Sequence, residues 1–280
     1  MNCPTWRVPR PHRPGNPAVK APPVPATRFF DNLSYVGNEM VGCFVLDTGS
    51  GLICLDNMEP DDALYIEQGI RDLGYDPAGL KHILITHGHL DHFGNAVYFR
   101  EKYGTKLWMS KTDEVWAKDV DALPEKNVKI PLAFGMDGNL EDGQIFTLGD
   151  ARIECLWTPG HTPGCMSFLF TVYDEGRPHT CALWGGTGPR KTLAENQQLL
   201  ASIHKFQRRT AQRGVDVAIS THPFMDNAVT RLALCRTLSD GVPNPFVIGQ
   251  DANRRFELMY QRLYEDVVAG MKARQSPPNN

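Results

Sequence analysis

The chain has 280 residues, of which 41% are hydrophobic and 22% charged, the composition of an ordinary globular protein with one large core. Its formal net charge of −3 leaves no basic excess that would attract nucleic acid. No apolar run approaches the ~20 residues that span a bilayer. We therefore expect a small-molecule partner, with neither nucleic acid nor a membrane involved, and make no prediction of the oligomeric state.

The N-terminal region differs in composition from the rest of the chain. Residues 1–28 contain eight prolines and no acidic residue, which predicts a tail or strap before a single domain at 29–275. Residues 276–280 are expected to be a disordered C-terminus. The tail has no apolar segment typical of a secretory signal, and the seven cysteines are scattered without a CxxC pair. Both features favour a cytoplasmic protein with reduced thiols.

The first half of the domain is predicted to hold short apolar strands followed by amphipathic helices. Strands are expected at 33–36, 41–46, 52–55, 82–86 and 106–109, and helices at 61–73, 95–103 and 112–118. Residues 119–142 are predicted to be a loop.

The second half repeats this order. Strands are expected at 144–148, 151–157, 166–172, 180–184 and 215–220, and helices at 193–213, 226–239 and 251–273. Strands followed by helices, twice over, predict two sheets that pack face to face and carry helices on their outer faces. The expected fold class is therefore α/β, as a four-layer αββα sandwich.

Four side chains able to bind a metal ion occur within six residues of one another. The segment Thr86–His92 reads Thr-His-Gly-His-Leu-Asp-His, and it follows an apolar strand directly. Side chains two apart at a strand end point the same way, so one short loop can surround two adjacent cations. Imidazole and carboxylate are ligands that suit zinc. The candidate ligands are His87, His89, Asp91 and His92.

Two isolated histidines stand in matching positions. His161 lies in Thr158–Gly164, after the strand expected at 151–157, and His222 follows the strand expected at 215–220. Functional groups are often displayed where a strand ends and a loop begins. With these two histidines, the sequence predicts a site for two zinc ions.

These motifs resemble those of the metallo-β-lactamase fold superfamily, over roughly residues 29–224. THGHLDH is similar to the superfamily's THxHxDH signature, and TPGHTPG to its next metal-binding turn. The resemblance implies a first zinc on His87, His89 and His161, and a second on Asp91, His92 and His222. It also implies that Asp56 orients the ligand loop; the alternative is a plain turn aspartate.

One departure narrows the resemblance. Glyoxalase-type and many lactonase-type members bridge the two metals with an aspartate, and here Gly186 occupies that position. The third β-lactamase subclass also lacks a bridging side chain, and the chain looks most like that subclass. The subclass uses serines after this strand to bind the drug's carboxylate, and Thr187 and Arg190 stand there instead. These two residues are candidates for substrate binding; a solvated surface arginine is the alternative for Arg190.

The expected activity is zinc-dependent hydrolysis. A metal-bound hydroxide would cleave a small ester, lactone or amide, and Asp91 would orient the nucleophile and relay a proton. A true metallo-β-lactamase is the alternative within hydrolases. An iron-dependent oxidoreductase similar to the persulfide dioxygenases is the alternative of another class, although His92 and His222 would then be surplus. A zinc-binding protein without catalysis is the remaining alternative.

The substrate pocket is expected to be lined by three segments: the loop after Asp56, residues 119–142 and the stretch after Gly186. Four aromatic side chains are candidates either for its walls or for ordinary core positions: Trp108, Trp116, Trp184 and Phe224.

Overall fold

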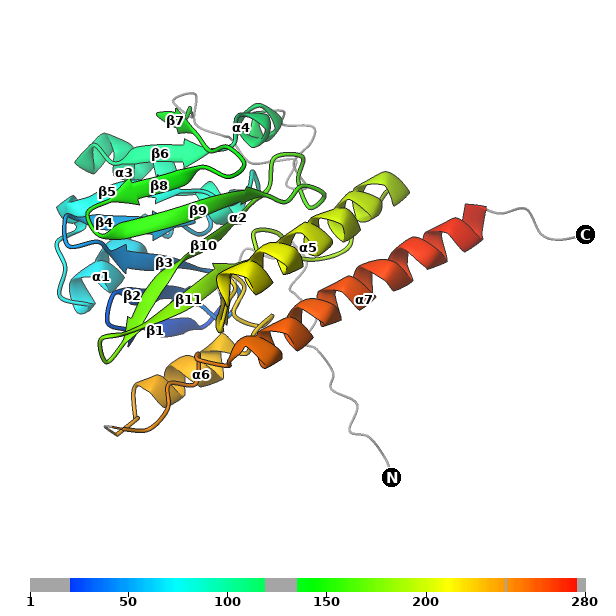
Figure 1. Ribbon diagram of the computed structural model, residues 1–280. Coiled ribbons are helices and arrows are strands. Elements are labelled where there is room, and N and C mark those ends of the chain that lie inside the picture. The colour runs from blue at the N-terminus through cyan, green and yellow to red at the C-terminus, as the bar shows by residue number, and fades with distance from the viewer. Residues whose placement is uncertain (1–20, 119–134, 240, 276–280) are drawn as a thin grey trace, which may run out of the picture.

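Two β-sheets pack face to face, with helices covering both outer faces (Figure 1). This computed structural model describes residues 21–118, 135–239 and 241–275. The first half of the chain forms one sheet and its helices, and the second half forms the other. The predicted four-layer αββα sandwich is therefore confirmed.

The first sheet contains seven strands in the order of the sequence. Strands β1 to β4 are antiparallel to their neighbours, and β4 to β7 run parallel. The strands are β1 (Pro23–Phe30), β2 (Leu33–Asn38), β3 (Gly42–Asp47), β4 (Leu52–Leu55), β5 (Leu80–Leu84), β6 (Lys106–Met109) and β7 (Gly138–Asn139). The helices of this half are α1 (Ala63–Asp72), α2 (Leu90–Phe93), α3 (Ala96–Tyr103) and α4 (Lys111–Ala117), with a 3₁₀ turn at Pro77–Gly79.

The second sheet contains five strands in the order β12-β11-β10-β9-β8. These are β8 (Ile145–Leu148), β9 (Ala151–Trp157), β10 (Met166–Asp174), β11 (Arg177–Leu183) and β12 (Val217–Ile219). The helices are α5 (Leu193–Arg213), α6 (Ala228–Cys235) and α7 (Gln250–Gln275). No helix in the described part of the chain is long and apolar enough to cross a membrane.

The strands read as continuous apolar runs because both of their faces are buried. In β3, Phe44 and Leu46 point into the core between the two sheets. Cys43 and Val45 alternate with them and pack outward against the helices of the first half. A third apolar cluster lies between the second sheet and the pair α5 and α7.

The predicted tail boundary at residue 28 is wrong, because it falls inside β1. Val24 in this strand is buried, and β1 pairs with β2. Pro23 and Pro25 are tolerated because β1 is an edge strand, where one side of the backbone needs no hydrogen bonds from the sheet. Residues 1–20 and 276–280 lie outside the described residues, as do 119–134 of the predicted loop.

Five strands end at the same edge of the molecule. β4 and β5 are parallel, β11 and β12 are parallel, and β9 runs in the same direction as β11 because both are antiparallel to β10. The two sheets are joined there by backbone hydrogen bonds from Met166 N to Thr86 O and from Gly42 N to Thr221 O, each 2.8 Å long. The predicted ligands all follow strands that end at this edge.

Candidate metal centre

The six predicted ligands gather into two groups of three. In each group, one ligand atom from every residue lies within 4.8 Å of the others. We call His87, His89 and His161 the first trio, and Asp91, His92 and His222 the second trio.

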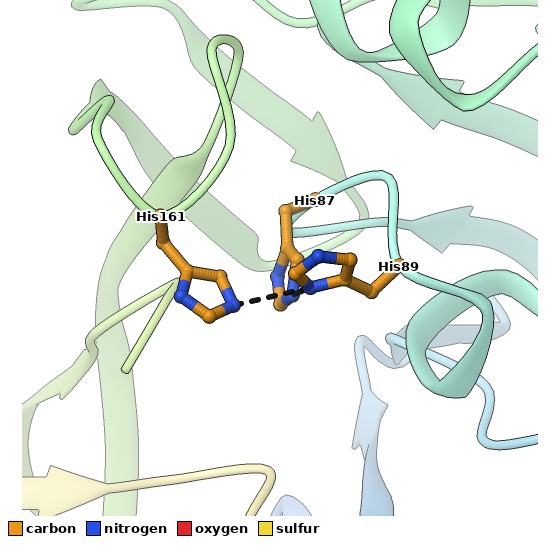
Figure 2. Close-up of side chains that lie close together, drawn as sticks. All are labelled: His87, His89 and His161. Atoms are coloured by element: carbon orange, nitrogen blue, oxygen red, sulfur yellow. Dashed lines mark hydrogen bonds between the residues drawn. The ribbon is translucent and has the colours of Figure 1, made fainter. Parts of the chain in front are cut away.

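The first trio consists of three imidazole rings that face one another (Figure 2). Nδ1 of His89 lies 3.1 Å from Nε2 of His87 and 3.1 Å from Nε2 of His161. Nitrogen atoms bound to one tetrahedral zinc ion are separated by about 3.4 Å, given zinc–nitrogen bonds of about 2.0–2.1 Å. Both nitrogen–nitrogen distances to His89 are therefore close to the value that one zinc ion requires, and the ligand atoms of the third pair, His87 and His161, lie within 4.8 Å of each other.

The ring of His87 is oriented by Thr86. The Thr86 hydroxyl donates its single proton to Oδ2 of Asp56 at 2.8 Å. It can therefore only accept from Nδ1–H of His87, 2.9 Å away. This fixes the proton of His87 on Nδ1 and leaves the lone pair of Nε2 facing the centre of the first trio.

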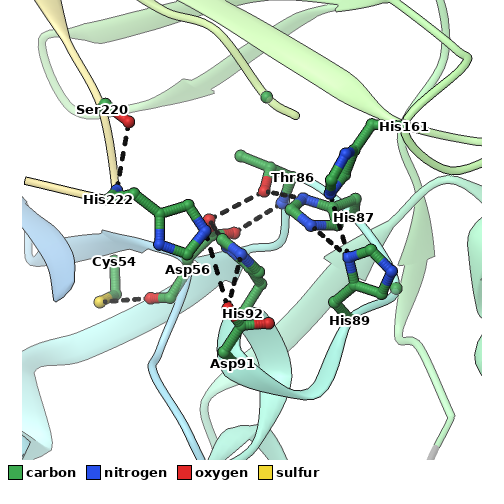
Figure 3. Close-up of polar contacts among 12 residues, drawn as sticks. Cys54, Asp56, Thr86, His87, His89, Asp91, His92, His161, Ser220 and His222 are labelled. Carbon is green, nitrogen blue, oxygen red and sulfur yellow. Dashed lines mark hydrogen bonds and ion pairs between the residues drawn. The ribbon is translucent and has the colours of Figure 1, made fainter. Parts of the chain in front are cut away.

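The second trio combines a carboxylate with two imidazoles (Figure 3). Oδ2 of Asp91 lies 3.4 Å from Nε2 of His92 and 3.6 Å from Nε2 of His222. The other nitrogen of each ring has its own acceptor: Nδ1 of His92 donates to Asp56 at 2.7 Å, and Nδ1 of His222 donates to the carbonyl of Met40 at 2.9 Å. Both rings consequently present Nε2 toward Asp91.

Asp56 contacts the supports of both trios. It is fully buried after β4 and has a left-handed backbone, with φ at 59°, which is strained for a non-glycine residue. Its Oδ1 accepts from the Thr86 amide at 2.7 Å, and its Oδ2 accepts from the Thr86 hydroxyl and from His92. One carboxylate thus holds both the residue before His87 and the ring of His92.

The charges of the two trios differ. Burial lowers the pKa of His87 and His161 well below the usual value, and lowers that of His89 to about 3. Burial also lowers the pKa of His92, but Asp91 and Asp56 outweigh it and raise the pKa to about 10. Burial raises the pKa of Asp91, and His92 outweighs that in turn, so the pKa of Asp91 lies well below its usual range. The first trio is therefore neutral, whereas the second contains an ion pair.

The donor set fits a metal ion. Nε2 of His92 is buried and faces the centre of the second trio, where its ion-pair partner, Oδ2 of Asp91, lies 3.4 Å away and makes no good hydrogen bond with it. Leaving a buried polar atom unpaired is costly unless something else binds it. Zinc takes neutral imidazoles and carboxylates as donors in proteins, so a zinc ion bound at the second trio would replace the Nε2 proton of His92.

Gly186 follows β11 and touches the first trio. A Cβ atom added at this residue would lie 2.5 Å from Cβ of His161. No side chain fits between the backbone at 186 and His161 as placed. The sequence indicates that no carboxylate bridges the two trios at this position, and the structure leaves no room for one there.

The two candidate substrate-binding residues lie just beyond Gly186. Thr187 is partly exposed. The backbone of Arg190 is held by Asn196, which accepts from its amide at 2.9 Å and donates to its carbonyl at 2.8 Å. The positive charge of Arg190 contributes to the lowered pKa of both His89 and His161, so the guanidinium lies near the first trio. Its Nε is buried without a hydrogen-bond partner, and no carboxylate among the described residues pairs with it.

The four aromatic candidates divide into two pairs. The ring of Trp116 lies 5.4 Å from that of His89, and Phe224, 44% exposed, lies 5.4 Å from the ring of His222. Trp108 and Trp184 instead belong to the apolar core, where each packs edge-on against a phenylalanine. Only the first pair borders the metal centre.

Two supports of the site were not predicted from the sequence. One is the carbonyl of Met40, at the tip of the β2–β3 hairpin, which accepts from His222. The other is the carboxylate of Asp113 in α4, which accepts hydrogen bonds from both loops that carry the first trio. The only sequence signal for Asp113 is the helix-capping pattern that starts at Ser110, because Ser110 caps α4 by accepting from the Asp113 amide.

The family model of the metallo-beta-lactamase superfamily matches residues 27–173, just over half of the chain. The chain belongs to the metallo-β-lactamase superfamily. It is 30% identical over 152 residues to the hydroxyacylglutathione hydrolase GloC of Haemophilus influenzae, covering 52% of this chain and 64% of that protein. It is 29% identical over 144 residues to the probable metallo-hydrolase YqgX of Bacillus subtilis, covering 50% of this chain and 66% of that protein. The chain thus spans slightly less than two thirds of these relatives.

Solved structures of this superfamily extend the similarity to nearly the whole chain. BJP-1, a subclass B3 metallo-β-lactamase of Bradyrhizobium japonicum, superposes with a TM-score of 0.75 at 26% identity, covering 91% of this chain and 97% of that one. FEZ-1 of Legionella gormanii gives a TM-score of 0.80 at 20% identity, covering 91% and 99%. The predicted likeness to the third β-lactamase subclass is confirmed.

Proposed function

We propose that this protein is a zinc-dependent hydrolase that cleaves a small anionic ester, lactone or amide. The observation that carries the proposal is the pair of trios, which place two sets of three donor atoms side by side at the strand ends. The first trio would hold one zinc ion and the second trio the other. Zinc bound there would lower the pKa of a coordinated water toward about 7 and polarise a substrate carbonyl.

Asp91 is the residue we assign to proton transfer. Its side chain is 29% exposed, whereas that of His92 beside it is 1% exposed. The carboxylate therefore reaches the solvent-facing side of the second trio, where a substrate would enter. One oxygen faces the two histidines, and the other is the atom we expect to accept a proton and return it to the leaving group.

Arg190 would bind an anionic group of the substrate. Arg190 is partly exposed, and no carboxylate of the described residues pairs with its charge, so its guanidinium is free to bind a substrate carboxylate. Trp116 lies beside the first trio and Phe224 beside the second, and both would contact apolar parts of the same substrate. We therefore favour an acyl compound that combines a carboxylate with an apolar portion, with Thr187 as a further hydrogen-bonding group.

The comparisons support hydrolysis of an acyl compound, but they do not favour one type of scissile bond over another. One relative is named for hydroxyacylglutathione hydrolysis, and solved neighbours are β-lactamases. A β-lactamase is the second candidate, favoured by the whole-chain likeness to BJP-1. We rank it below ester or lactone hydrolysis because Thr187 and Arg190 replace the serines expected to bind the drug. The cytoplasmic location stays a prediction.

The test combines metal analysis of the purified protein with a hydrolysis panel of lactones, esters, thioesters and β-lactams. We expect two zinc ions per chain, and for His161→Ala the loss of one ion with an activity at least about 100-fold lower. His204→Ala is the control, because His204 lies on α5 and belongs to neither trio; this variant should retain both zinc ions and the activity. Rapid turnover of a chromogenic cephalosporin would favour the β-lactamase instead. Iron bound to the purified protein, together with oxygen consumption in the presence of glutathione persulfide, would overturn the proposal of a hydrolase.

A further inference from the structure

Helix α4 lies against both loops that carry the first trio. Its residue Asp113 is fully buried. Oδ2 of Asp113 accepts from the Gly88 amide at 2.9 Å and from the Thr162 hydroxyl at 2.5 Å, and Oδ1 accepts from the Gly164 amide at 2.6 Å. Gly88 separates His87 from His89, and Thr162 directly follows His161. One carboxylate thus joins the two ligand-bearing loops.

The backbone of both loops rests directly on α4. A Cβ atom added at Gly164 would overlap Oγ of Ser110 and lie 2.6 Å from the Asp113 amide nitrogen. One added at Gly88 would lie 3.0 Å from the Trp116 ring and 3.1 Å from the Asp113 carbonyl. These close approaches leave the loops little freedom to move toward the helix, and the hydrogen bonds of Asp113 prevent them from moving away.

We propose that Asp113 is a positioning residue for the first metal site, which sets the separation at which His87, His89 and His161 converge. This inference rests on the proposed two-metal site. All three groups that face the carboxylate are donors to it, so only an acceptor satisfies them. An amide in its place would turn an N–H₂ group toward at least one of them. The second trio has different supports, Asp56 and the carbonyl of Met40.

The decisive variant is Asp113→Asn, and the probe is zinc alone. Metal-free protein is titrated with zinc against a competing chelator, and His161→Ala identifies which binding step belongs to the first trio. We expect the first-site affinity to fall by about 10- to 100-fold, and the second-site affinity to change by less than about 3-fold. In the metal-free variant, amide hydrogen exchange at Gly88 and Gly164 should be faster than in wild type.

Two further variants separate positioning from simple stability. Ser110→Ala removes the cap of α4 but leaves the three bonds of Asp113 in place. It should lower the thermal midpoint while both zinc affinities stay within about 3-fold of wild type. Thr162→Val removes one of the three donors and should weaken the first site less than Asp113→Asn does. Thr162→Val also provides the test if Asp113→Asn fails to fold.

Equal losses at both sites in Asp113→Asn would overturn the inference. So would a Ser110→Ala variant that matches Asp113→Asn in first-site zinc affinity. If Asp113→Asn does not fold, unchanged first-site affinity in Thr162→Val would overturn it. A wild-type protein that binds no zinc would instead overturn the proposed function and, with it, this inference.

Discussion

The two trios lie side by side, since the rings of His87 and His92 are only 3.9 Å apart, yet they are held together by different means. The first trio is made of neutral rings from two loops, and no charge draws these rings together before a metal binds. The second trio contains the attraction between Asp91 and His92. We infer that the first trio depends on the scaffold that spaces its loops, whereas the second trio is held by the Asp91–His92 attraction in addition to its supports, Asp56 and the carbonyl of Met40. Each prediction below tests that contrast through zinc affinity.

The largest effect is expected for Asp91→Asn, which removes the carboxylate of the second trio. The variant keeps the size of the side chain but loses the charge and one anionic donor. Zinc affinity at the second site should fall by more than about 100-fold, and turnover by about 100- to 10,000-fold. First-site affinity should change by less than about 10-fold. A similar loss at both sites, measured by zinc titration, would mean that the trios are not independent.

Asp56→Asn should affect both trios, because Asp56 holds Thr86 on one side and His92 on the other. We expect zinc affinity to fall by about 10- to 100-fold at each site. Asp216→Asn is a matched control, because Asp216 also accepts from a histidine and from a backbone amide but lies away from the centre. Loss at the second site alone would show that the bond to Thr86 does not orient His87.

Gly186→Ala tests the dependence of the first trio on spacing with a smaller change. The added methyl group would overlap His161, so the ring must shift away from His87 and His89. First-site zinc affinity should fall by about 10-fold, with the second site unaffected. Gly79→Ala is the control, since nothing lies within 4 Å of a Cβ atom there. An unchanged first-site affinity would show that His161 can relocate at no cost.

The sequence predicted the layers and most elements because their signals are local. Apolar runs marked the strands, and the bounds predicted for α5, 193–213, agree with the structure because Thr192 and Gly214 cap its two ends. β1 was missed because its prolines resemble those of the tail before it. α2 was missed because it is four residues long and is formed largely by the ligand motif itself.

The gathering of the six candidate ligands was predictable because each one follows an apolar run that reads as a strand. Their supports were not. Asp113 is 25 residues from Gly88 and 51 from Gly164 in the sequence. Nothing in the sequence around either glycine indicates that its backbone amide needs a side-chain acceptor. The carbonyl of Met40 is a backbone group that any residue would supply. Such contacts follow from tertiary packing, which no local pattern encodes.

The smallest effect on zinc affinity is expected for substitution of Glu67, which stabilises a part of the fold away from both trios. This buried carboxylate accepts from Lys102 at 2.6 Å, Tyr103 at 2.7 Å and Tyr98 at 2.8 Å, and so links α1 to α3. Burial raises its pKa, but Lys102 and the two tyrosines outweigh burial and lower the pKa to about 2. The ionised form is therefore favoured by folding. Its stabilising contribution is complete above about pH 5 and is lost as the pH falls toward 2.

Glu67→Gln should accordingly lower the free energy of unfolding of the metal-free protein by about 2 kcal/mol at pH 7, a value reduced for the partial exposure of Lys102. Urea unfolding at pH 7 and pH 3 should show the difference from wild type shrinking at the lower pH. Glu265→Gln, which removes the partner of the exposed Arg262 on α7, should change the free energy of unfolding little. Both zinc affinities should stay at the wild-type values. A stability difference that does not vary with pH would mean that Glu67 acts through packing rather than charge, and an altered first-site affinity would extend the scaffold of the first trio to α1 and α3.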